Sequence, residues 1–179
     1  DAQKEIEQYY EVKRIPISSI PPQTLNEYAG IVIAKPTMPF SEFDKFKLDQ
    51  YVMNGGKILW LIDSQIADMD SLNNEPYFMS AGYDLKLDDL LFRYGVRINA
   101  NLVQDIQCEA IPILSSVKNG NPQQKLLPWI FFPVAAPMDN HAIVKNIDHV
   151  WFQFASTIDT TASQKIHKTV LLRSSPYSR

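Results

Sequence analysis

Two short apolar runs separated by a helix-like stretch form the clearest hydrophobic pattern in the chain. The runs span Ile31–Ala34 and residues 57–62, and such uninterrupted apolar segments are typical of parallel strands that are covered on both faces. Ser41 is suited to cap a helix over residues 41–54, which Gly55 would end in a left-handed conformation with Gly56 directly after it. The pattern therefore predicts two adjacent, central, parallel strands joined by a right-handed crossover helix.

The spacing of apolar residues within 41–54 also predicts which side of that helix is buried. The side chains expected to face the core are Phe43, Phe46, Tyr51 and Val52. The side chains expected to point away from the core are Lys45, Lys47 and Asp49. On this prediction the aromatic side of the helix packs on the sheet and the lysines remain in water.

Weaker patterns divide the rest of the chain. A polar helix is predicted over residues 1–8, extended alternation over 9–17, a long polar loop over 64–81, and a short helix over 86–94 that Gly95 ends. Further strand candidates occupy residues 96–98, 102–103, 108–114, 129–134, 150–155 and 166–172, with a loop over 115–125 that turns around Asn119 and Gly120. This order predicts an α/β fold in a single domain over residues 1–179. Its sheet would be doubly wound, mostly parallel and flavodoxin-like, extended by antiparallel strands toward the C-terminus.

Charge and cysteine content narrow the possible partners. The chain has 179 residues, of which 17 are basic and 20 acidic, and its net charge is −3. This balance argues against a nucleic-acid partner, because phosphate binding needs a basic face. Cys108 is the single cysteine, so the chain has no internal disulfide, which suits the cytosol and a large periplasmic domain equally. No apolar run reaches the roughly 20 residues that cross a bilayer. Because the chain opens at Asp1 inside a predicted helix, we expect it to be a fragment of a longer protein.

Residues with catalytic or metal-binding chemistry do not occur in the required patterns. The three histidines have no metal-ligand spacing, and a calcium loop around Asp68 fails because Asn73 replaces the required glycine. Cys108 lacks the small neighbours of a nucleophile elbow. The pair Gly55 and Gly56 follows a predicted helix, whereas a phosphate-binding loop would precede one. We therefore expect no enzymatic activity, no metal and no cofactor.

The C-terminal ends of the two apolar strands give the best candidate site, because ligands of open parallel sheets bind beyond those ends. The candidate side chains, which we call the strand-end surface, are Lys35, Pro36, Thr37, Asp63, Ser64, Tyr77 and Phe78. Asp105 is a further candidate. The apolar rings of Tyr77 and Phe78 suit either a surface for protein partners or a lid packed on the core. Together with Trp129 they suit, alternatively, an aromatic platform for a small molecule or glycan.

Two longer stretches carry a family resemblance. They are IVIAKPTMPFSEFDKFKLDQYVMNGGKILWLID and LDDLLFRYGVRINANLVQD, and their sharpest elements are Asp49-Gln50-Tyr51, Asn54-Gly55-Gly56, Asp70-Ser71-Leu72 and Tyr94-Gly95-Val96. The segments PWIFFP, residues 151–159 and KTVLLRSSPYS extend the similarity over nearly the whole chain. Together they resemble GldG, the gliding-motility-associated ABC transporter auxiliary family of Bacteroidetes.

The resemblance implies a fold similar to class I glutamine amidotransferase-like domains, with a first strand missing ahead of residue 1. The catalytic Cys-His-Glu set of those enzymes does not carry over, because no residue here sits in a G-x-C-x-G elbow. The resemblance also implies a periplasmic domain of an inner-membrane-anchored protein, with this fragment itself outside the bilayer. Its expected partners are the ABC permease and ATPase subunits or other envelope proteins.

Three functions remain open at this point. The first is a non-catalytic auxiliary or interaction domain of a gliding-motility-type envelope ABC transporter. The second is a small-molecule or glycan binding module of the same transporter. The third is a hydrolase or transferase that uses Asp63 or Cys108.

Overall fold

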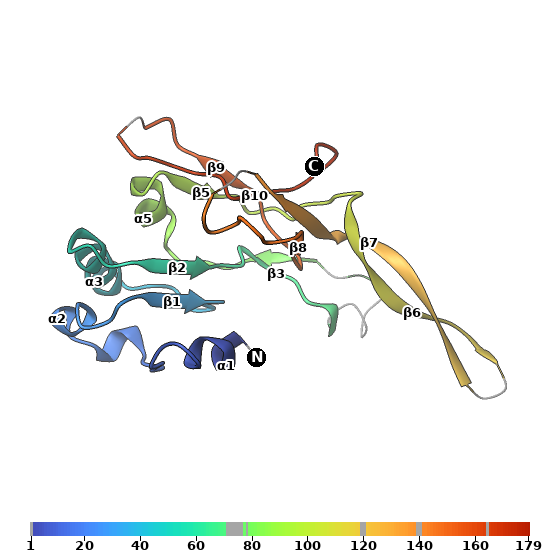
Figure 1. Cartoon of the computed structure of the whole chain (residues 1–179), viewed down its shortest axis with the longest axis horizontal. Coiled ribbons are helices and arrows are strands. Elements are labelled where there is room, and N and C mark those ends of the chain that lie inside the picture. Colours follow the sequence, from blue (N-terminus) through green and yellow to red (C-terminus); the bar gives the residue numbers. More distant parts are fainter. Residues whose placement is uncertain (1, 71–76, 78, 119–120, 139–140, 164) are drawn as a thin grey trace.

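The computed structural model describes residues 2–70, 77, 79–118, 121–138, 141–163 and 165–179 (Figure 1). The described helices are α1 (Ala2–Glu7), α2 (Pro22–Leu25), α3 (Glu42–Met53) and α5 (Asp88–Arg93), with a 3-10 turn η1 at Ile17–Ser19. The described strands are β1 (Ile31–Ala34), β2 (Ile58–Leu61), β3 (Gln65–Ile66), β4 (Ala81–Gly82), β5 (Val96–Ile98), β6 (Cys108–Lys118), β7 (Asn121–Pro137), β8 (Val150–Trp151), β9 (Ile158–Thr160) and β10 (Leu172–Arg173). None of the helices in this described part has the length and hydropathy needed to cross a membrane.

The strand–helix–strand unit forms as the apolar pattern predicts. β1 and β2 are parallel neighbours that pair in register, and α3 connects them. The Ser41 Oγ accepts a hydrogen bond from the Asp44 backbone N–H at 3.1 Å, which caps the first turn of α3. Gly55 has φ +89°, the left-handed conformation that ends a helix, and Gly95 has the same φ after α5. The parallel pairing, the crossover helix and both glycine stops are therefore confirmed.

The prediction that both faces of these two strands are covered is wrong. Within the described residues β1 pairs with β2 alone, and on one face Val32, Leu59 and Leu61 are 53%, 53% and 49% exposed. On the other face Trp60 packs against a buried leucine cluster between residues 85 and 91. An apolar run shows that a strand avoids water, but it does not show which segment of which chain covers it. β1 and β2 are thus edge strands here, and a doubly wound parallel sheet stays a prediction.

Helix α3 buries a different side from the one predicted. Tyr51 is buried as expected, but Lys45 and Lys47 are buried with it. The rings of Phe43 and Phe46 are 59% and 51% exposed and stack on each other with centroids 6.4 Å apart. The rings of Phe43 and Phe46 therefore face outward, whereas the ring of Tyr51 faces the core.

Specific acceptors explain the burial of Lys47. Its Nζ donates a hydrogen bond to the Ile17 carbonyl at 2.5 Å and lies 2.9 Å from the Asp44 Oδ1. A buried ammonium group is tolerated when it is paired and hydrogen-bonded, and its aliphatic stem packs like an apolar side chain. Lys47 thereby fastens the turn η1 to α3.

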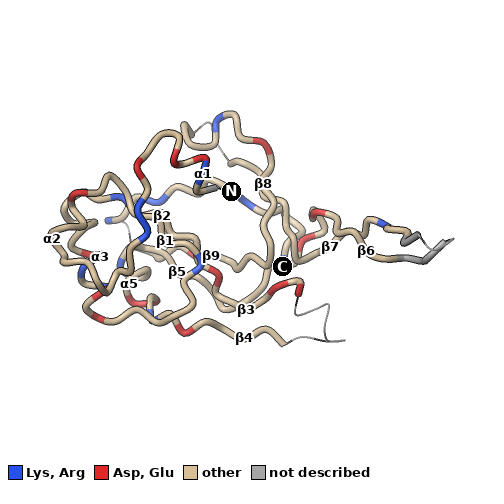
Figure 2. The backbone as a smooth tube through the Cα atoms, turned by 90° about the horizontal axis from the view of Figure 1, so that it is seen from below, with Lys and Arg blue, Asp and Glu red and all other residues tan. Residues whose placement is uncertain are grey.

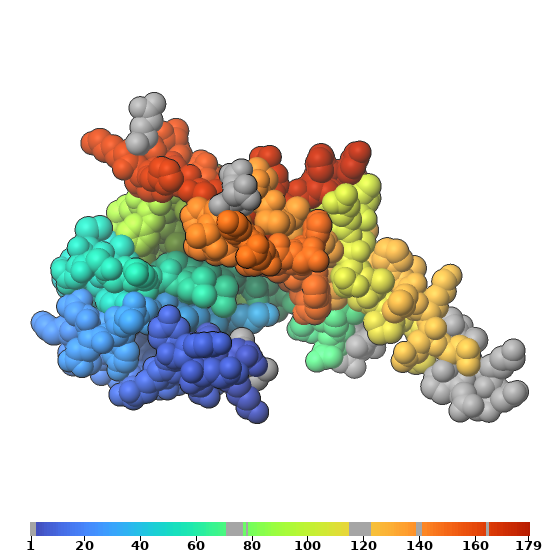
Figure 3. Space-filling view, viewed as in Figure 1, coloured from blue at the N-terminus to red at the C-terminus, as the bar shows by residue number. Residues whose placement is uncertain are grey.

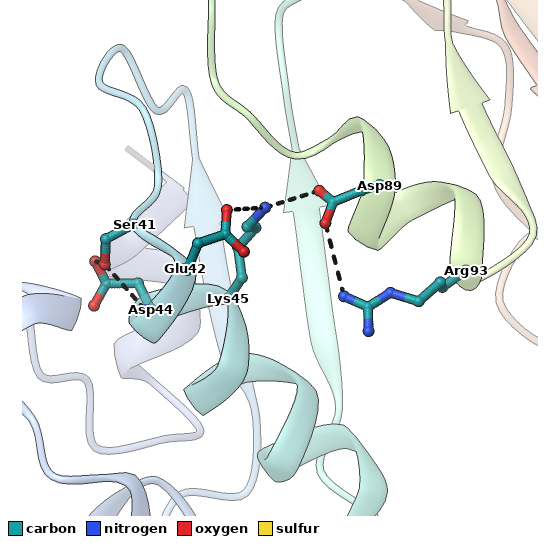
Figure 4. Close-up of polar contacts among 6 residues, drawn as sticks. All are labelled: Ser41, Glu42, Asp44, Lys45, Asp89 and Arg93. Carbon is teal, nitrogen blue, oxygen red and sulfur yellow. Dashed lines mark hydrogen bonds and ion pairs between the residues drawn. The ribbon is translucent and has the colours of Figure 1, made fainter.

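Lys45 joins α3 to α5 in a similar way (Figure 4). Its Nζ lies 2.7 Å from the Glu42 Oε1 and 2.9 Å from the Asp89 Oδ1. Hydrogen bonds to Glu42 and Asp89 raise the pKa of Lys45, and the same bond to Lys45 lowers the pKa of Asp89. Arg93 adds a longer contact of 3.8 Å to Asp89. These charges hold the two helices together through a lysine that was expected to remain in water.

The C-terminal half is organised around a long antiparallel hairpin. β6 and β7 pair from Cys108 opposite Pro133 out to Lys118 opposite Asn121. Figures 1 and 3 show this pair projecting from the body. β8 and β10 pair with the base of β7, while β3 pairs with β4 and β5 with β9 in small antiparallel sheets.

Several strand boundaries in the sequence-based prediction are wrong. The hairpin strands run through residues 115–118 and 121–125, which were expected to form a loop, while 119–120 lie outside the described residues. Residues 9–17 and 102–103 form no strand. Residues 150–155 and 166–172 overlap only the short strands β8 and β10. Polar side chains mislead here because β-propensity depends on context, so local composition alone does not show where a strand ends.

Candidate functional site

The C-terminal ends of β1 and β2 bring two predicted site residues into contact. Lys35 follows β1, and its backbone N–H donates to the Leu61 carbonyl at 2.8 Å, which continues the pairing of the two strands. Asp63 follows β2, and its Oδ2 lies 3.1 Å from the Lys35 Nζ. The lysine side chain is largely exposed, so solvent screens this ion pair. The expected meeting of Lys35 and Asp63 at this edge is present in the structure.

Lys35 and Asp63 line a pocket of about 310 Å³. Its other walls come from Gln65, residues 67–70, Gln153 and Phe154. The volume lies at the lower end of the roughly 300–1,000 Å³ that small-molecule sites occupy. Lys35 and Phe154 have φ values of 48° and 52°, a left-handed conformation that is uncommon outside glycine. Two strained backbone positions at one pocket make it a candidate site for a small ligand.

The other described strand-end residues do not line this pocket. The Ser64 Oγ donates to the Asn99 carbonyl at 2.9 Å and lies 2.6 Å from the Ser156 Oγ. Ser64 therefore ties the end of β2 to the C-terminal half of the chain. Pro36 is half-buried and Thr37 is exposed, and neither lines the pocket.

The aromatic part of the strand-end surface is open to solvent where it is described. Tyr77 is 78% exposed and Met79 is 86% exposed, whereas Phe78 lies outside the described residues. Such exposure disagrees with a lid packed on the core and fits a surface available to a partner. Trp129 packs on Phe131 with ring centroids 5.9 Å apart and has its Nε1 buried. It therefore gives no open aromatic platform together with Tyr77.

Cys108 lacks the electrostatic surroundings of a reactive thiol. Burial and the nearby carboxylates of Asp105 and Glu109 raise its pKa, so the thiol stays protonated at neutral pH. Within the described residues, no group of three His, Cys, Asp or Glu side chains has the geometry to hold a metal ion.

Asp105 has a structural position and does not join the strand-end surface. It is buried and accepts hydrogen bonds from the Ser175 backbone N–H at 2.8 Å, the Ser175 Oγ at 2.5 Å and the Gln107 N–H at 2.9 Å. Burial alone would raise the pKa of Asp105, but these hydrogen bonds hold it below its usual value. The carboxylate thus fastens the C-terminal segment to the start of β6.

Charges of both signs are interspersed along the backbone (Figure 2). This pattern accompanies a net charge of −3, which does not favour nucleic-acid phosphates as a partner.

Sequence reasoning missed the C-terminal wall of the pocket, formed by Gln153 and Phe154. The Phe154 N–H donates to the Phe131 carbonyl at 2.9 Å, which fixes this residue beside β7. A left-handed phenylalanine has no signature in sequence, so only the assembled fold reveals it. The spacing of Asp68 and Asp70 is visible in the sequence, but it suggested a calcium loop and not this pocket.

Comparisons with known proteins place the chain in a family. A family model described as "ABC-type uncharacterized transport system" (ABC_transp_aux) matches residues 1–179. Among solved structures, the chain is similar to the "mmIFT52 N-terminal domain", with a TM-score of 0.58 and 16% sequence identity. The similarity covers 90% of this chain and 60% of the other, so the chain spans about three fifths of that structure. At this identity the similarity shows the fold alone. No curated protein matches the chain.

Proposed function

This chain belongs to the ABC-type transport auxiliary family, and we propose that it is a non-catalytic domain through which such a transport system contacts other proteins. The GldG-like stretches support a finer assignment, to a gliding-motility-type ABC transporter of the cell envelope. On this proposal the domain is periplasmic and belongs to a protein anchored in the inner membrane. Its partners are then the permease and, through it, the ATPase, or other envelope proteins.

The mode of action rests on apolar side chains displayed beside the strand ends. Met38, Tyr77 and Met79 are each at least 76% exposed. Burying a large apolar side chain on a partner stabilises a complex by roughly 1.5–3 kcal/mol, whereas leaving it in water brings no gain. These side chains therefore support contact with a protein surface as the function of the strand-end loops.

The chemistry at the site supports a non-catalytic role. Asp63 is paired with the Lys35 ammonium group, and the Cys108 thiol stays protonated. A nucleophile needs an adjacent base or a lowered pKa, and neither side chain has such an arrangement. The hydrolase or transferase alternative that would use Asp63 or Cys108 therefore has little physical support.

Small-molecule binding is a second candidate function, favoured by the pocket between Lys35, Asp63 and Phe154. A thermal-shift series with mono- and disaccharides at millimolar concentration tests it on the purified chain. Ligand binding would raise the melting temperature, and Lys35→Ala would remove that rise if the pocket is the site. Unchanged melting with every sugar would argue against a glycan-binding module.

Partner capture tests the leading proposal. The full-length protein is affinity-purified from native membranes, with Tyr77→Ser combined with Met79→Ser as the variant and Tyr177→Ser as the control at a similarly exposed aromatic (67%). We expect the double variant to lose permease and ATPase subunits while the isolated domain keeps its melting temperature. Equal recovery of these subunits with the double variant would contradict a role for the strand-end surface.

A further inference from the structure

The ion pair at the ends of β1 and β2 brings charges of both signs to one pocket. Lys35 and Asp63 both line this pocket, and the Lys35 Nζ lies 3.1 Å from the Asp63 Oδ2. Their side chains are 75% and 38% exposed, so the protein encloses neither charge. An exposed ion pair contributes little to the stability of a fold. A ligand can therefore replace this contact with contacts of its own without disturbing the fold.

The backbone keeps Lys35 at the pocket independently of its ion pair. Its N–H donates to the Leu61 carbonyl at 2.8 Å, so the pairing of the two strands fixes its position. Its φ of 48° is an uncommon conformation for a residue with a side chain. Such conformations persist where the surrounding structure determines them, and they cluster at ligand sites. The lysine thus stays at the pocket when its carboxylate partner is engaged elsewhere.

Apolar residues form a further part of the pocket lining. They are Ala67, Met69 and Phe154. The Phe154 ring packs edge-on against the Phe132 ring with centroids 5.3 Å apart, which holds it in place. The pocket volume of about 310 Å³ suits a small ligand. The lining therefore combines a charged pair with apolar surface, which suits a small ligand that carries both kinds of group.

Two more carboxylates shift the charge balance of the pocket. Asp68 and Asp70 line it together with Asp63, so the described lining holds three acidic side chains and one basic one. Within the described residues, no three such groups have the geometry to hold a metal ion. Like charges repel, so a ligand whose only charge is a carboxylate is disfavoured by this excess of acids. A ligand whose only charge is an ammonium group brings no partner for Lys35.

From this arrangement we infer that the pocket binds a zwitterionic α-amino acid with an apolar side chain. Its carboxylate contacts Lys35 and its ammonium group contacts Asp63. The ammonium nitrogen and the carboxylate oxygens of an α-amino acid lie about 3 Å apart, because only the Cα and the carboxyl carbon separate them. This spacing matches the 3.1 Å between the Lys35 Nζ and the Asp63 Oδ2, so opposite charges of ligand and protein can lie side by side.

Both contacts to the amino acid are charge-assisted hydrogen bonds, which are stronger than bonds between neutral groups. The inference rests on the small-molecule function proposed above for this pocket and names the class of its ligand. It is separate from the protein contacts proposed for Tyr77 and Met79.

Isothermal titration calorimetry of the purified chain tests the inference with probes that share one side chain. The probes are L-leucine, L-leucine methyl ester, which keeps only the ammonium group, and N-acetyl-L-leucine, which keeps only the carboxylate. D-glucose serves as the uncharged probe. We expect L-leucine to bind and the methyl ester to bind at least tenfold more weakly. N-acetyl-L-leucine and D-glucose should give no binding heat.

Neutral substitutions at the pocket show whether the ion pair is the binding site. Lys35→Gln and Asp63→Asn should each weaken L-leucine binding at least tenfold. The matched controls are Lys13→Gln and Glu11→Gln, at an exposed ion pair of 3.0 Å whose residues do not line the pocket. These controls should bind L-leucine like the wild-type chain. Thermal melts check that each variant remains folded.

The possible results separate this inference from the function on which it rests. Equal affinity for L-leucine and either singly charged analogue would overturn the inference, and so would L-leucine binding that survives both pocket variants. Binding of D-glucose without binding of L-leucine would also overturn it, while small-molecule binding at the pocket would stand. Absence of binding heat with all four probes at millimolar concentration would overturn the inference. If the saccharide series were negative as well, the small-molecule function would fail with it.

Discussion

The two glycines after α3 differ in what they contribute to stability. Gly55 has φ +89°, and a Cβ added there would meet no atom within 4 Å. Glycine is therefore needed at position 55 because of the backbone conformation. Gly56 has no such φ, but an added Cβ would overlap the ring carbons of Tyr51. Glycine is therefore needed at position 56 because a larger side chain would not fit.

These two mechanisms predict different costs for alanine. Gly55→Ala places a Cβ on a left-handed residue and should destabilise the fold by about 1 kcal/mol. Gly55→Val adds a branched side chain at the same position and should cost more than about 1 kcal/mol. Gly56→Ala must displace Tyr51, whose ring is buried and whose hydroxyl donates to the Tyr28 carbonyl at 3.1 Å. Overpacking combined with the loss of that hydrogen bond gives about 2–4 kcal/mol.

Urea denaturation of the purified chain measures these costs. Gly30→Ala serves as the control, because its added Cβ would only touch the Lys57 carbonyl at an ordinary 3.7 Å. The decisive comparison is a double-mutant cycle with Tyr51→Leu, which removes the aromatic ring that the new methyl group would overlap. In the Tyr51→Leu background we expect Gly56→Ala to cost less than about 1 kcal/mol. Additive free energies in this cycle, or a Gly56→Ala variant as stable as wild type, would refute the steric argument.

Three further predictions concern the buried charges and the absence of catalysis. Hydrogen bonds lower the pKa of Asp105 in the folded state, so its contribution to stability is full above about pH 4 and is lost as the pH falls through the lowered value. Asp105→Ala should therefore cost about 2–4 kcal/mol at pH 7 and less near pH 2. Denaturation at each pH measures this cost. Lys47→Met should destabilise the chain by about 1–3 kcal/mol, because it removes the hydrogen-bond partner of two partly buried acceptors, the Ile17 carbonyl and the Asp44 carboxylate. Phe46→Ser, at an exposed side chain, should change stability by about 0.5 kcal/mol or less in the same assay. The purified domain should show no esterase, amidase, phosphatase or glutaminase activity, and activity that disappears in Cys108→Ala or Asp63→Asn would contradict this.

The strand–helix–strand unit could be predicted because its signals are local. An N-cap serine, a left-handed glycine and two apolar runs act within a few residues of the elements they define. The buried side of α3 could not be predicted in this way. Lys47 is held by a carbonyl 30 positions away, and Lys45 by an aspartate 44 positions away. Such distant acceptors leave no trace in the helical periodicity of the sequence.

The candidate site was predictable only in part, for a similar reason. Lys35 and Asp63 end neighbouring parallel strands, so topology alone brings them together. Phe154 reaches the same pocket from the C-terminal half through its unusual backbone conformation. Ser64 shares the expected edge but turns toward Asn99, and no rule of strand topology sets that direction.

Photo-cross-linking from the strand-end surface tests the central claim most directly. A photoreactive amino acid replaces Tyr77 or Met79 in the full-length protein, and Tyr177 serves as the control position of comparable exposure. After irradiation of native membranes, cross-linked products are identified by mass spectrometry. The account predicts adducts with the permease or another envelope protein of the transport system from Tyr77 and Met79, and not from Tyr177. Irradiation that yields no protein adduct at Tyr77 or Met79, or the same adducts from all three positions, would contradict an interaction role for this surface.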